Sequence, residues 1–384
     1  MRRRSRMLLL GVAVASSGLF VVLLTAFSTA SEGPIGAMLD RIGASVGSIE
    51  YQIRARVSGS PRTRDLAWFA PYRQDTSRLR QPDTVLLGAY DSDVTRTLEG
   101  IVGLERALAT TLPLIQIYGA WGDKADQRFP LRLATTIRNM GSVPVVTWEP
   151  WLTDFENGKH PLLPLRDARD RHGMGAVARG DYDFYIDAWA ADAARFGSPI
   201  FVRLAHEMND PYRYPWGPQN NTKEEFIGAW QRVVTRFRRA GATNVIWVWS
   251  PHVAYPYWDT YYPGGDVVDW VATGALNFGT VAHWSQWWSF HELFGMKYDD
   301  LAAFNKPVMI AELASLNVGG DRADWYRSAL TDLPHAYPSV KAVLFFQARG
   351  DQTVTYQQVD WSIGDDPAVS RTVADAIRPW APPR

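Results

Sequence analysis

The sequence predicts an α/β protein whose main domain is a (β/α)8 barrel, also called a TIM barrel. From Thr84 onward, short apolar runs alternate with amphipathic helical segments. Continuous apolar runs are typical of strands that are buried on both faces of a parallel sheet. Eight such runs without a glycine-rich phosphate-binding fingerprint favour a closed barrel over an open, doubly wound sheet. The predicted strands cover residues 85–88, 114–118, 143–148, 200–205, 245–249, 267–273, 307–311 and 342–346.

The helical segments between these strands carry their own start and stop signals. Across residues 222–240, Thr222 and Glu225 form a capping box, apolar side chains share one face, and Gly241 ends the helix. Residues 181–196 and 321–333 show the same helical periodicity. Strand and helix signals therefore alternate as a (β/α)8 barrel requires.

The composition excludes several classes of function. The chain has 384 residues, which is enough for one large domain of about 250–300 residues. Its formal net charge is zero, which argues against nucleic acid or an anionic membrane surface as a partner. It has no cysteine, so disulfides, thiolate catalysis and cysteine-ligated zinc are excluded. The 17 Trp, 16 Tyr and 16 Phe either fill the core or line a groove for sugar rings.

The first 30 residues predict export to the periplasm or the cell exterior. Four arginines within the first six residues precede an uncharged run over 7–27 and a small-residue site that ends at Ala30. This order is typical of a cleaved signal peptide, and the run is also long enough to remain as a membrane anchor. We divide the chain into a signal peptide or membrane anchor (1–30), a connector or outer wrapping segment (31–82) and the barrel (83–384).

The connector is rich in positive charge. Five arginines lie around Trp68, Phe69 and Tyr72 within residues 61–82. We interpret this stretch as a solvated collar beneath the barrel rather than as a binding patch.

Two glutamates stand out where apolar strands end. Glu207 follows the fourth predicted strand and Glu312 follows the seventh. In a (β/α)8 barrel the active site lies at the carboxyl ends of the strands, so both side chains are expected at the mouth. A retaining glycosidase needs two carboxyl groups about 5–5.5 Å apart, one as acid/base and one as nucleophile. The alternative is that each glutamate only pairs with Arg203 or with a helix terminus.

The motifs around these glutamates resemble glycoside hydrolase family 26. RLAHEMN (203–209) is followed by YPWG, and KPVMIAELAS (306–315) by GGDRADW (319–325). The likeness extends from LLGAY near the first strand to Asp360-Trp361. The family comprises clan A β-glycanases, mainly endo-β-mannanases with some β-glucanases and β-1,3-xylanases. The resemblance implies an endo-acting, retaining glycosidase with β-mannan or a β-1,4- or β-1,3-1,4-glucan as its substrate.

The resemblance also implies roles for particular residues. Glu207 matches the acid/base and Glu312 the nucleophile. His206 and Asn209 would orient the acid and the sugar hydroxyls, and Trp216 resembles the aromatic residue near the cleavage point. Strand ends and loops add further candidates for substrate binding, which are Trp121, Trp148, Glu149, Tyr262 and Trp284. Trp284 shares its loop with Trp287 and Trp288, which form either a sugar-stacking wall or a hydrophobic plug.

Three positions depart from the usual family pattern. The third strand ends in TWEPW (147–151), where mannanases usually have a histidine, and this favours a glucan-type substrate. The sixth strand reads TGALN (273–277) and lacks the tyrosine whose hydroxyl touches the nucleophile, unless Tyr262 or another ring replaces it. The eighth strand has Phe345-Phe346-Gln347 where a tryptophan platform is common.

The altered sixth strand and the possible membrane anchor keep a second hypothesis open, that of a non-catalytic barrel that binds glycan beside a polysaccharide synthesis or export system. The intact pair of glutamates favours the enzyme. The sequence predicts no cofactor and no metal, since the HExxH pattern that begins at His206 and again at His291 lacks its second histidine. The expected partner is a polysaccharide, and the expected state is a monomer.

Overall fold

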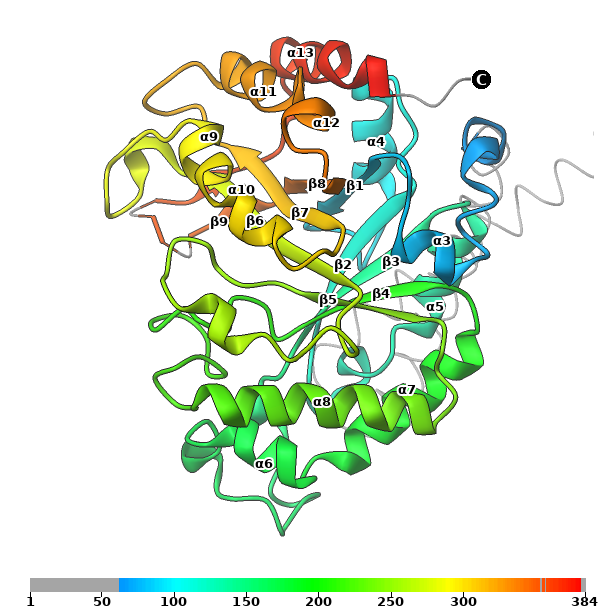
Figure 1. The fold of residues 1–384 in the computed structure, drawn as a ribbon, viewed down its shortest axis with the longest axis vertical. Coiled ribbons are helices and arrows are strands. Elements are labelled where there is room, and N and C mark those ends of the chain that lie inside the picture. Colours follow the sequence, from blue (N-terminus) through cyan, green and yellow to red (C-terminus); the bar gives the residue numbers. More distant parts are fainter. Residues whose placement is uncertain (1–61, 353, 356, 381–384) are drawn as a thin grey trace, which may run out of the picture. The chain divides into compact units, whose positions relative to one another are not determined.

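Eight parallel strands close into a barrel in the computed structural model, which describes residues 62–352, 354–355 and 357–380 (Figure 1). The strands follow one another around the barrel in sequence order, and β1 pairs with β8 to close it. The prediction of a (β/α)8 barrel is confirmed. The strands are β1 (Leu86–Asp91), β2 (Leu114–Ala120), β3 (Val143–Glu149), β4 (Ile200–Leu204), β5 (Val245–Trp249), β6 (Trp270–Asn277), β7 (Val308–Ser315) and β8 (Val340–Gln347). A separate two-stranded sheet joins β9 (Arg349–Asp351) to β10 (Val359–Asp360).

Helices surround the barrel and follow the predicted caps. Thr222 accepts a hydrogen bond from the backbone N–H of Glu225 and completes the capping box at the start of α8. Gly197 follows α7 with a φ of 67°, a conformation that glycine adopts without strain. The α-helices are α3 (Thr76–Arg80), α4 (Glu99–Leu108), α5 (Leu131–Asn139), α6 (Gly173–Arg179), α7 (Asp183–Phe196), α8 (Lys223–Arg239), α9 (Phe290–Leu293), α10 (Tyr298–Ala302), α11 (Arg322–Leu330), α12 (Leu333–Ala336) and α13 (Pro367–Ile377).

The sixth and seventh strands differ from their predicted bounds. β6 begins at Trp270, and directly before it the Asp269 carboxylate accepts a hydrogen bond from the backbone N–H of Trp247. β7 continues to Ser315, since Glu312 is followed by Leu313 and other side chains that are buried. Glu312 therefore lies within a strand and not just after it.

The amino-terminal ends of the strands are closed by residues that precede the predicted barrel. Leu66, Phe69 and Leu79 are buried in one core cluster with side chains from the strands. The indole nitrogen of Trp270 donates a hydrogen bond of 2.9 Å to the carbonyl of Leu79. The described part of the connector therefore seals the barrel: these apolar side chains are buried, whereas the side chains of Arg64 and Arg78 are exposed, as expected of a solvated collar.

Arg62 contributes a buried ion pair at this end of the molecule. Its Nε and Nη2 atoms donate to the two carboxylate oxygens of Glu105, at 2.9 and 2.7 Å. The arginine is 5% exposed and the glutamate 7%. Arg62 and Glu105 thus form a buried ion pair near the amino-terminal ends of the strands.

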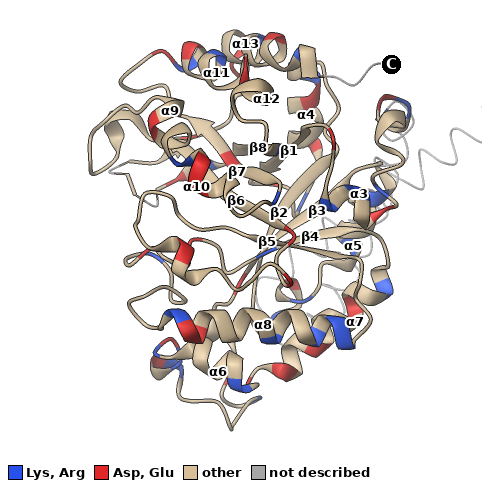
Figure 2. Ribbon diagram, viewed as in Figure 1, with Lys and Arg blue, Asp and Glu red and all other residues tan. Residues whose placement is uncertain are grey.

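Charges of both signs are interspersed on the outer helices (Figure 2). On the facing sides of α7 and α8, Arg232 pairs with Asp183, and Arg236 pairs with Asp187. Within the described residues, no helix has both the length and the apolar character that a membrane crossing requires. The predicted signal peptide or anchor over residues 1–30 lies outside the described part of the chain.

Candidate active site

A strained turn after β4 carries Glu207 into the mouth of the barrel. Ala205 and Glu207 have φ angles of 43° and 54°, which are costly for residues other than glycine. The Ala205 N–H donates to the carbonyl of Trp148, and the Glu207 N–H donates to that of Ser250, at 3.0 and 2.7 Å. The turn is thus fastened to the strand on one side and to the loop after β5 on the other.

The Glu207 carboxyl group is buried and poorly paired. The residue is 7% exposed, and its Oε2 atom accepts no hydrogen bond in the described structure. The nearest cation is Arg213, whose Nη1 lies 3.5 Å from Oε2. Burial raises the pKa of Glu207 above its ordinary value of 4.5; the charge of Glu312 raises it further, while His252 and Arg213 lower it. The net direction is upward, as a general acid requires.

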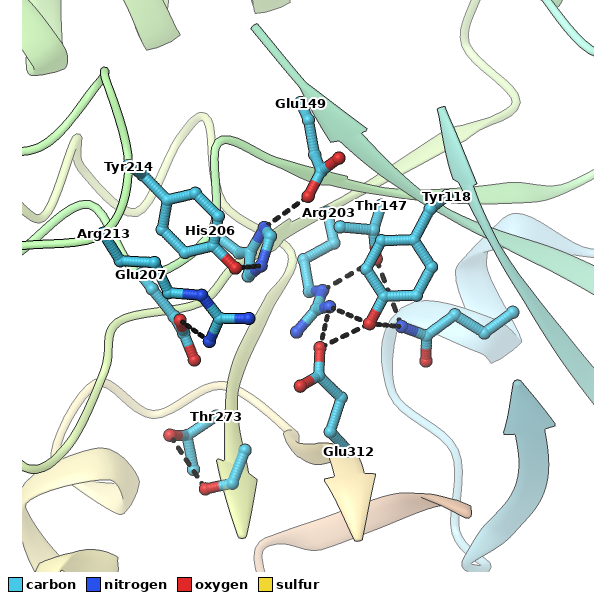
Figure 3. Close-up of polar contacts among 12 residues, drawn as sticks. Tyr118, Thr147, Glu149, Arg203, His206, Glu207, Arg213, Tyr214, Thr273 and Glu312 are labelled. Atoms are coloured by element: carbon cyan, nitrogen blue, oxygen red, sulfur yellow. Dashed lines mark hydrogen bonds and ion pairs between the residues drawn. The ribbon is translucent and has the colours of Figure 1, made fainter. Parts of the chain in front are cut away.

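The Glu312 carboxyl group has the opposite environment (Figure 3). The Tyr118 hydroxyl donates to Oε1 at 2.6 Å, and Arg203 donates to the same oxygen. Both bonds go to Oε1, and no hydrogen bond to Oε2 is found among the described residues. Burial would raise the pKa of Glu312, but Arg203 and the Tyr118 hydroxyl outweigh it and hold the pKa below its ordinary value.

Three strands supply the groups that hold Glu312. Arg203 on β4 is 1% exposed, and its Nε donates to the Thr147 hydroxyl on β3 at 2.9 Å. Its Nη2 donates to the Tyr118 hydroxyl on β2 at 3.1 Å. The hydroxyl that the sixth strand lacks is thus supplied by Tyr118. On β6, a Cβ atom at Gly274 would lie 3.8 Å from Glu312 Oε2, so this glycine leaves space beside the free oxygen.

The pKa values of the two glutamates at the barrel mouth are therefore shifted in opposite directions. One carboxyl group is buried without a close hydrogen-bond donor, and the other is ion-paired. Carboxyl groups whose environments push their pKa values apart are what acid and nucleophile roles require. Arg203 pairs with Glu312 and not with Glu207, so the alternative of a purely structural pair applies to one glutamate at most.

His206 and Asn209 contact protein groups and not the Glu207 carboxyl group. His206 Nε2 lies 3.0 Å from the Tyr214 hydroxyl, and burial lowers the pKa of this histidine well below 6.5, so the ring is neutral. The Asn209 amide donates to the carbonyl of His252 and accepts from its N–H, each at 2.8 Å. Asn209 therefore fastens the loop after β5, which leaves its amide little capacity for sugar hydroxyls.

Trp216 is buried against the turn that carries Glu207 and does not present an exposed ring to a substrate. It is 1% exposed and stacks on Tyr214 with ring centroids 4.5 Å apart. Its indole nitrogen donates to the carbonyl of His206 at 2.7 Å. Trp216 thereby fixes the backbone beside Glu207.

Trp121 and Trp148 are unsuited to substrate binding. Both have 0% exposure, and their rings lie 4.6 Å apart within a cluster that includes Tyr185 and Trp189 of α7. Successive side chains on a strand point to opposite faces. Since Thr147 points into the barrel, Trp148 must point toward the helices. A ring without exposed surface offers no face to a sugar, so the expectation that these two residues bind substrate is wrong.

Tyr262 also faces away from Glu312. Its ring packs 4.4 Å from that of Phe304 and 5.1 Å from that of Trp249, and its hydroxyl is buried without a partner in the described structure. It does not replace the missing tyrosine hydroxyl, which comes from Tyr118.

Glu149 brings a third carboxyl group to the mouth. It ends β3, and its Oε2 accepts a hydrogen bond of 3.1 Å from the indole nitrogen of Trp151. Its Oε1 lies 4.0 Å from His206 Nδ1. Burial raises the pKa of Glu149, as it does that of Glu207. Glu149 is therefore the natural rival for the role of acid.

Exposed aromatic rings are available for stacking on sugars. Trp284 is 48% exposed and packs edge-on against Phe278. Tyr212, in the loop after Glu207, is 78% exposed and lies 5.9 Å from the Tyr255 ring. In the Trp284 loop, Trp288 is only partly exposed and its carbonyl accepts a hydrogen bond from Trp325. The loop therefore exposes the ring of Trp284 to solvent, while Trp288 holds the loop against the barrel.

Glu207, Asp210 and His252 bring their ligand atoms within 4.8 Å of one another, a spacing that a cation could bridge. Arg213 opposes this, because its Nη1 lies 3.5 Å from Glu207 Oε2. His252 Nδ1 already accepts the N–H of Ala254 at 3.2 Å, so this nitrogen is not free to ligate a cation. The cluster suits hydrogen bonding around Glu207 better than metal binding, and we assign no metal to it.

Sequence reasoning missed Tyr118 and Arg213. Tyr118 had a visible signal, since it and Gln116 are polar residues spaced by two in an otherwise apolar strand, and so share its inner face. Arg213 had none, because its approach to Glu207 depends on the course of an irregular loop.

Comparisons with known proteins agree with the barrel and its motifs. Residues 182–329 match the model of Glycosyl hydrolase family 26. Endoglucanase H of Acetivibrio thermocellus is 33% identical over 256 residues, which are 64% of this chain and 25% of that protein. A mannan endo-1,4-beta-mannosidase of Bacillus subtilis is 26% identical over 164 residues, 41% of this chain and 40% of that protein. The chain thus spans well under half the length of these relatives.

Solved structures share the fold at low sequence identity. The mannanase man26 of Bacillus subtilis superposes with a TM-score of 0.55 at 17% identity, covering 80% of this chain and 92% of that chain. The β-mannanase BoMan26A of Bacteroides ovatus gives 0.55 at 16% identity, covering 84% and 94%. At such identity the likeness is evidence for the barrel alone.

Proposed function

Because residues 182–329 match the model of Glycosyl hydrolase family 26, we propose that the chain is a member of this family and a retaining glycosidase that cleaves within a β-linked glucan. In this proposal Glu207 is the acid/base and Glu312 the nucleophile. The observation that carries it is the opposite environment of the two carboxyl groups, one buried with a raised pKa and one held ionised by Arg203 and Tyr118.

The proposed reaction has two steps. Glu312 Oε2 attacks the anomeric carbon while Glu207 protonates the glycosidic oxygen; the carbon–oxygen bond breaks, and a glycosyl ester forms. Glu207, now ionised, then takes a proton from water as the water attacks the same carbon. The ester bond breaks, Glu312 leaves as a carboxylate, and the anomeric configuration is retained. Arg203 and Tyr118 favour the second step because they stabilise the departing carboxylate.

A glucan is favoured over a mannan by two observations. Glu149 and Trp151 lie at the end of β3, where mannanases usually have a histidine. Endoglucanase H is also 33% identical to this chain, against 26% for the Bacillus subtilis mannosidase. The basic, apolar leader over residues 1–30 further supports a site of action outside the cytoplasm.

The proposal predicts a bell-shaped dependence of kcat/KM on pH. The active form has Glu312 ionised and Glu207 protonated. The pKa of Glu312 is lowered, so the acid limb of the profile should lie below pH 4.5. The pKa of Glu207 is raised, so the alkaline limb should lie above pH 4.5. Initial rates on a soluble β-glucan across pH 3–9 would test this. An alkaline limb that persists in a Glu207→Gln variant would contradict the assignment.

Loss of the Glu207 carboxyl group should affect substrates according to their leaving group. We expect Glu207→Ala to lose about 10²- to 10⁴-fold in kcat/KM on β-glucan, because the departing sugar needs a proton. A dinitrophenyl β-cellobioside needs none, so its first step should be nearly unchanged. Pre-steady-state release of dinitrophenol would measure that step.

Glu149→Gln is the matched control, since Glu149 is a partly buried carboxyl group, 16% exposed, that also has a raised pKa. Leaving-group dependence in Glu149→Gln, and not in Glu207→Ala, would transfer the acid role to Glu149.

The native protein should first be assayed on barley glucan, cellulose, mannan and xylan. Binding without cleavage on all four would favour the glycan-binding barrel.

A further inference from the structure

The loop after Glu207 carries a cation that the two-carboxyl mechanism does not use. Arg213 is 35% exposed, although its Nη1 lies 3.5 Å from Glu207 Oε2. That distance is an ion pair but exceeds the ordinary length of a hydrogen bond. Among the described residues, Glu207 is the only carboxylate within ion-pair distance of the Arg213 guanidinium. Most of its N–H donors therefore remain for another group.

Arg213 is held in place by an aromatic ring. Its guanidinium carbon lies 5.0 Å from the centroid of the Tyr214 ring, and that ring stacks on the buried Trp216. A guanidinium held on a ring offers planar, paired donors whose spacing matches the two oxygens of a carboxylate. Arg213 is thus preorganised for an anion, whereas a mobile surface arginine is not.

The position of Arg213 fixes which part of a substrate it can reach. Glu207 must come within about 2.6–3.2 Å of the glycosidic oxygen to protonate it. Since Arg213 lies beside the Glu207 carboxyl group, its donors reach substituents on the sugar units next to the cleaved bond. Tyr212, exposed and adjacent in the same loop, offers a ring on which such a sugar could stack.

We propose that Arg213 selects a carboxylate-bearing sugar at the unit next to the scissile bond, so that the preferred substrate is an acidic rather than a neutral β-glucan. This inference rests on the glycosidase function proposed above. Binding of the carboxylate engages the Arg213 guanidinium, which then stabilises the ionised form of Glu207 less, and adds a negative charge near Glu207. Both changes favour the protonated form of Glu207, which is the form that the first step needs.

The test compares three substrates on one backbone. These are neutral cello-oligosaccharides, the same oligosaccharides oxidised to carboxylates at C6, and their succinyl half-esters. For the native protein, the ratio of kcat/KM on a carboxylated substrate to that on the neutral one should be about 10 to 100, the range for charge-assisted hydrogen bonds. In Arg213→Gln the ratio should fall to about one or below, and Arg213→Lys should lie between, since it keeps the charge but not the fork.

Arg349→Gln is the matched control, because Arg349 is an arginine of similar exposure that pairs with Asp91. Its ratio should stay within twofold of the native value. A gain on the C6 carboxylate alone, or on the half-ester alone, would identify where the carboxylate sits. If Arg213 served only to set the charge of Glu207, Arg213→Gln would alter all three substrates equally. An unchanged ratio would thus overturn the proposal.

A binding experiment separates this inference from the proposed function. Calorimetry with the Glu312→Gln variant measures affinity for the intact oligosaccharides without cleavage. Tighter binding of the carboxylated form that disappears in Glu312→Gln/Arg213→Gln would support the role of Arg213 even if no hydrolysis occurred. Equal binding of the neutral and carboxylated forms by Glu312→Gln would refute it, even if the native protein proved an active glycosidase.

Discussion

Replacement of Glu312 by glutamine should reduce kcat/KM on β-glucan by a factor on the order of 10⁵, the loss expected when a covalent nucleophile is removed. The introduced amide would keep the shape of the side chain and could still accept hydrogen bonds from Tyr118 and Arg203. It cannot form a glycosyl ester of comparable stability. Release of reducing ends, followed over days at high protein concentration, would measure the residual rate.

Loss of activity in this variant must be separated from loss of folding. Arg203 is 1% exposed, so removing its counter-charge is expected to cost about 3 kcal/mol of unfolding free energy. Glu105→Gln is the matched control, because it breaks the buried pair with Arg62 at the other end of the barrel. That variant should lose similar stability in denaturant unfolding but keep its activity. Equal losses of activity in both variants would point to folding as the cause.

A gain-of-function experiment makes the nucleophile assignment sharper. In Glu312→Ala, the space left beside Arg203 should admit azide, which the guanidinium attracts. Azide would attack the anomeric carbon from the face that Glu312 occupies and displace the leaving group, so a β-glycoside should yield an α-glycosyl azide. A β-azide, or no azide product with an activated aryl glycoside, would argue against Glu312 as the nucleophile.

The sequence was informative where local patterns determine the structure. Buried strands reveal themselves by apolar runs, and Thr222 with Glu225 marks a helix start that needs only its own neighbours. The barrel could therefore be predicted, and the approximate positions of Glu207 and Glu312 with it. The end of β7 was misplaced because a glutamate within an apolar strand normally signals that the strand has ended.

The shell around the two glutamates could be predicted only in part, because it depends on contacts across the barrel. Tyr118 on β2 reaches Glu312 on β7, and these strands are not neighbours. The alternation of side chains along a strand could have shown that Trp148 does not bind substrate. Its neighbour Thr147 is polar and points into the barrel, so Trp148 points outward. No local rule predicts the path that brings Arg213 to Glu207, because an irregular loop has no periodicity from which a direction can be inferred.

Arg203 should prove to be the residue that fixes the charge of Glu312. We expect Arg203→Met to lose roughly 3–5 kcal/mol of unfolding free energy at pH 7, because a carboxylate that is 6% exposed is left without its cation. Loss of the cation should also raise the pKa of Glu312, so the acid limb of the kcat/KM profile should move to higher pH. Urea unfolding and initial rates across the same pH range would measure both effects.

The pH dependence of the unfolding free energy tests whether Arg203 lowers the pKa of Glu312. In the native protein the pKa of Glu312 lies below its unfolded value, so its stabilising contribution is complete above that value and is lost as the pH falls through the folded pKa. In Arg203→Met, burial places the folded pKa above the unfolded one, so the contribution holds at low pH and is lost as the pH rises. The stability deficit of the variant should therefore shrink from pH 7 to pH 4.

Arg62→Met separates this effect from the general cost of breaking a buried pair. It removes the cation from Glu105 at the opposite end of the barrel, far along the chain from both catalytic candidates. We expect it to lose stability at pH 7 to a similar extent while the acid limb of its rate profile stays at the native position. If Arg203→Met also retained the native acid limb, Arg203 would be a structural partner of Glu312, and the ionised nucleophile would need another source of stabilisation.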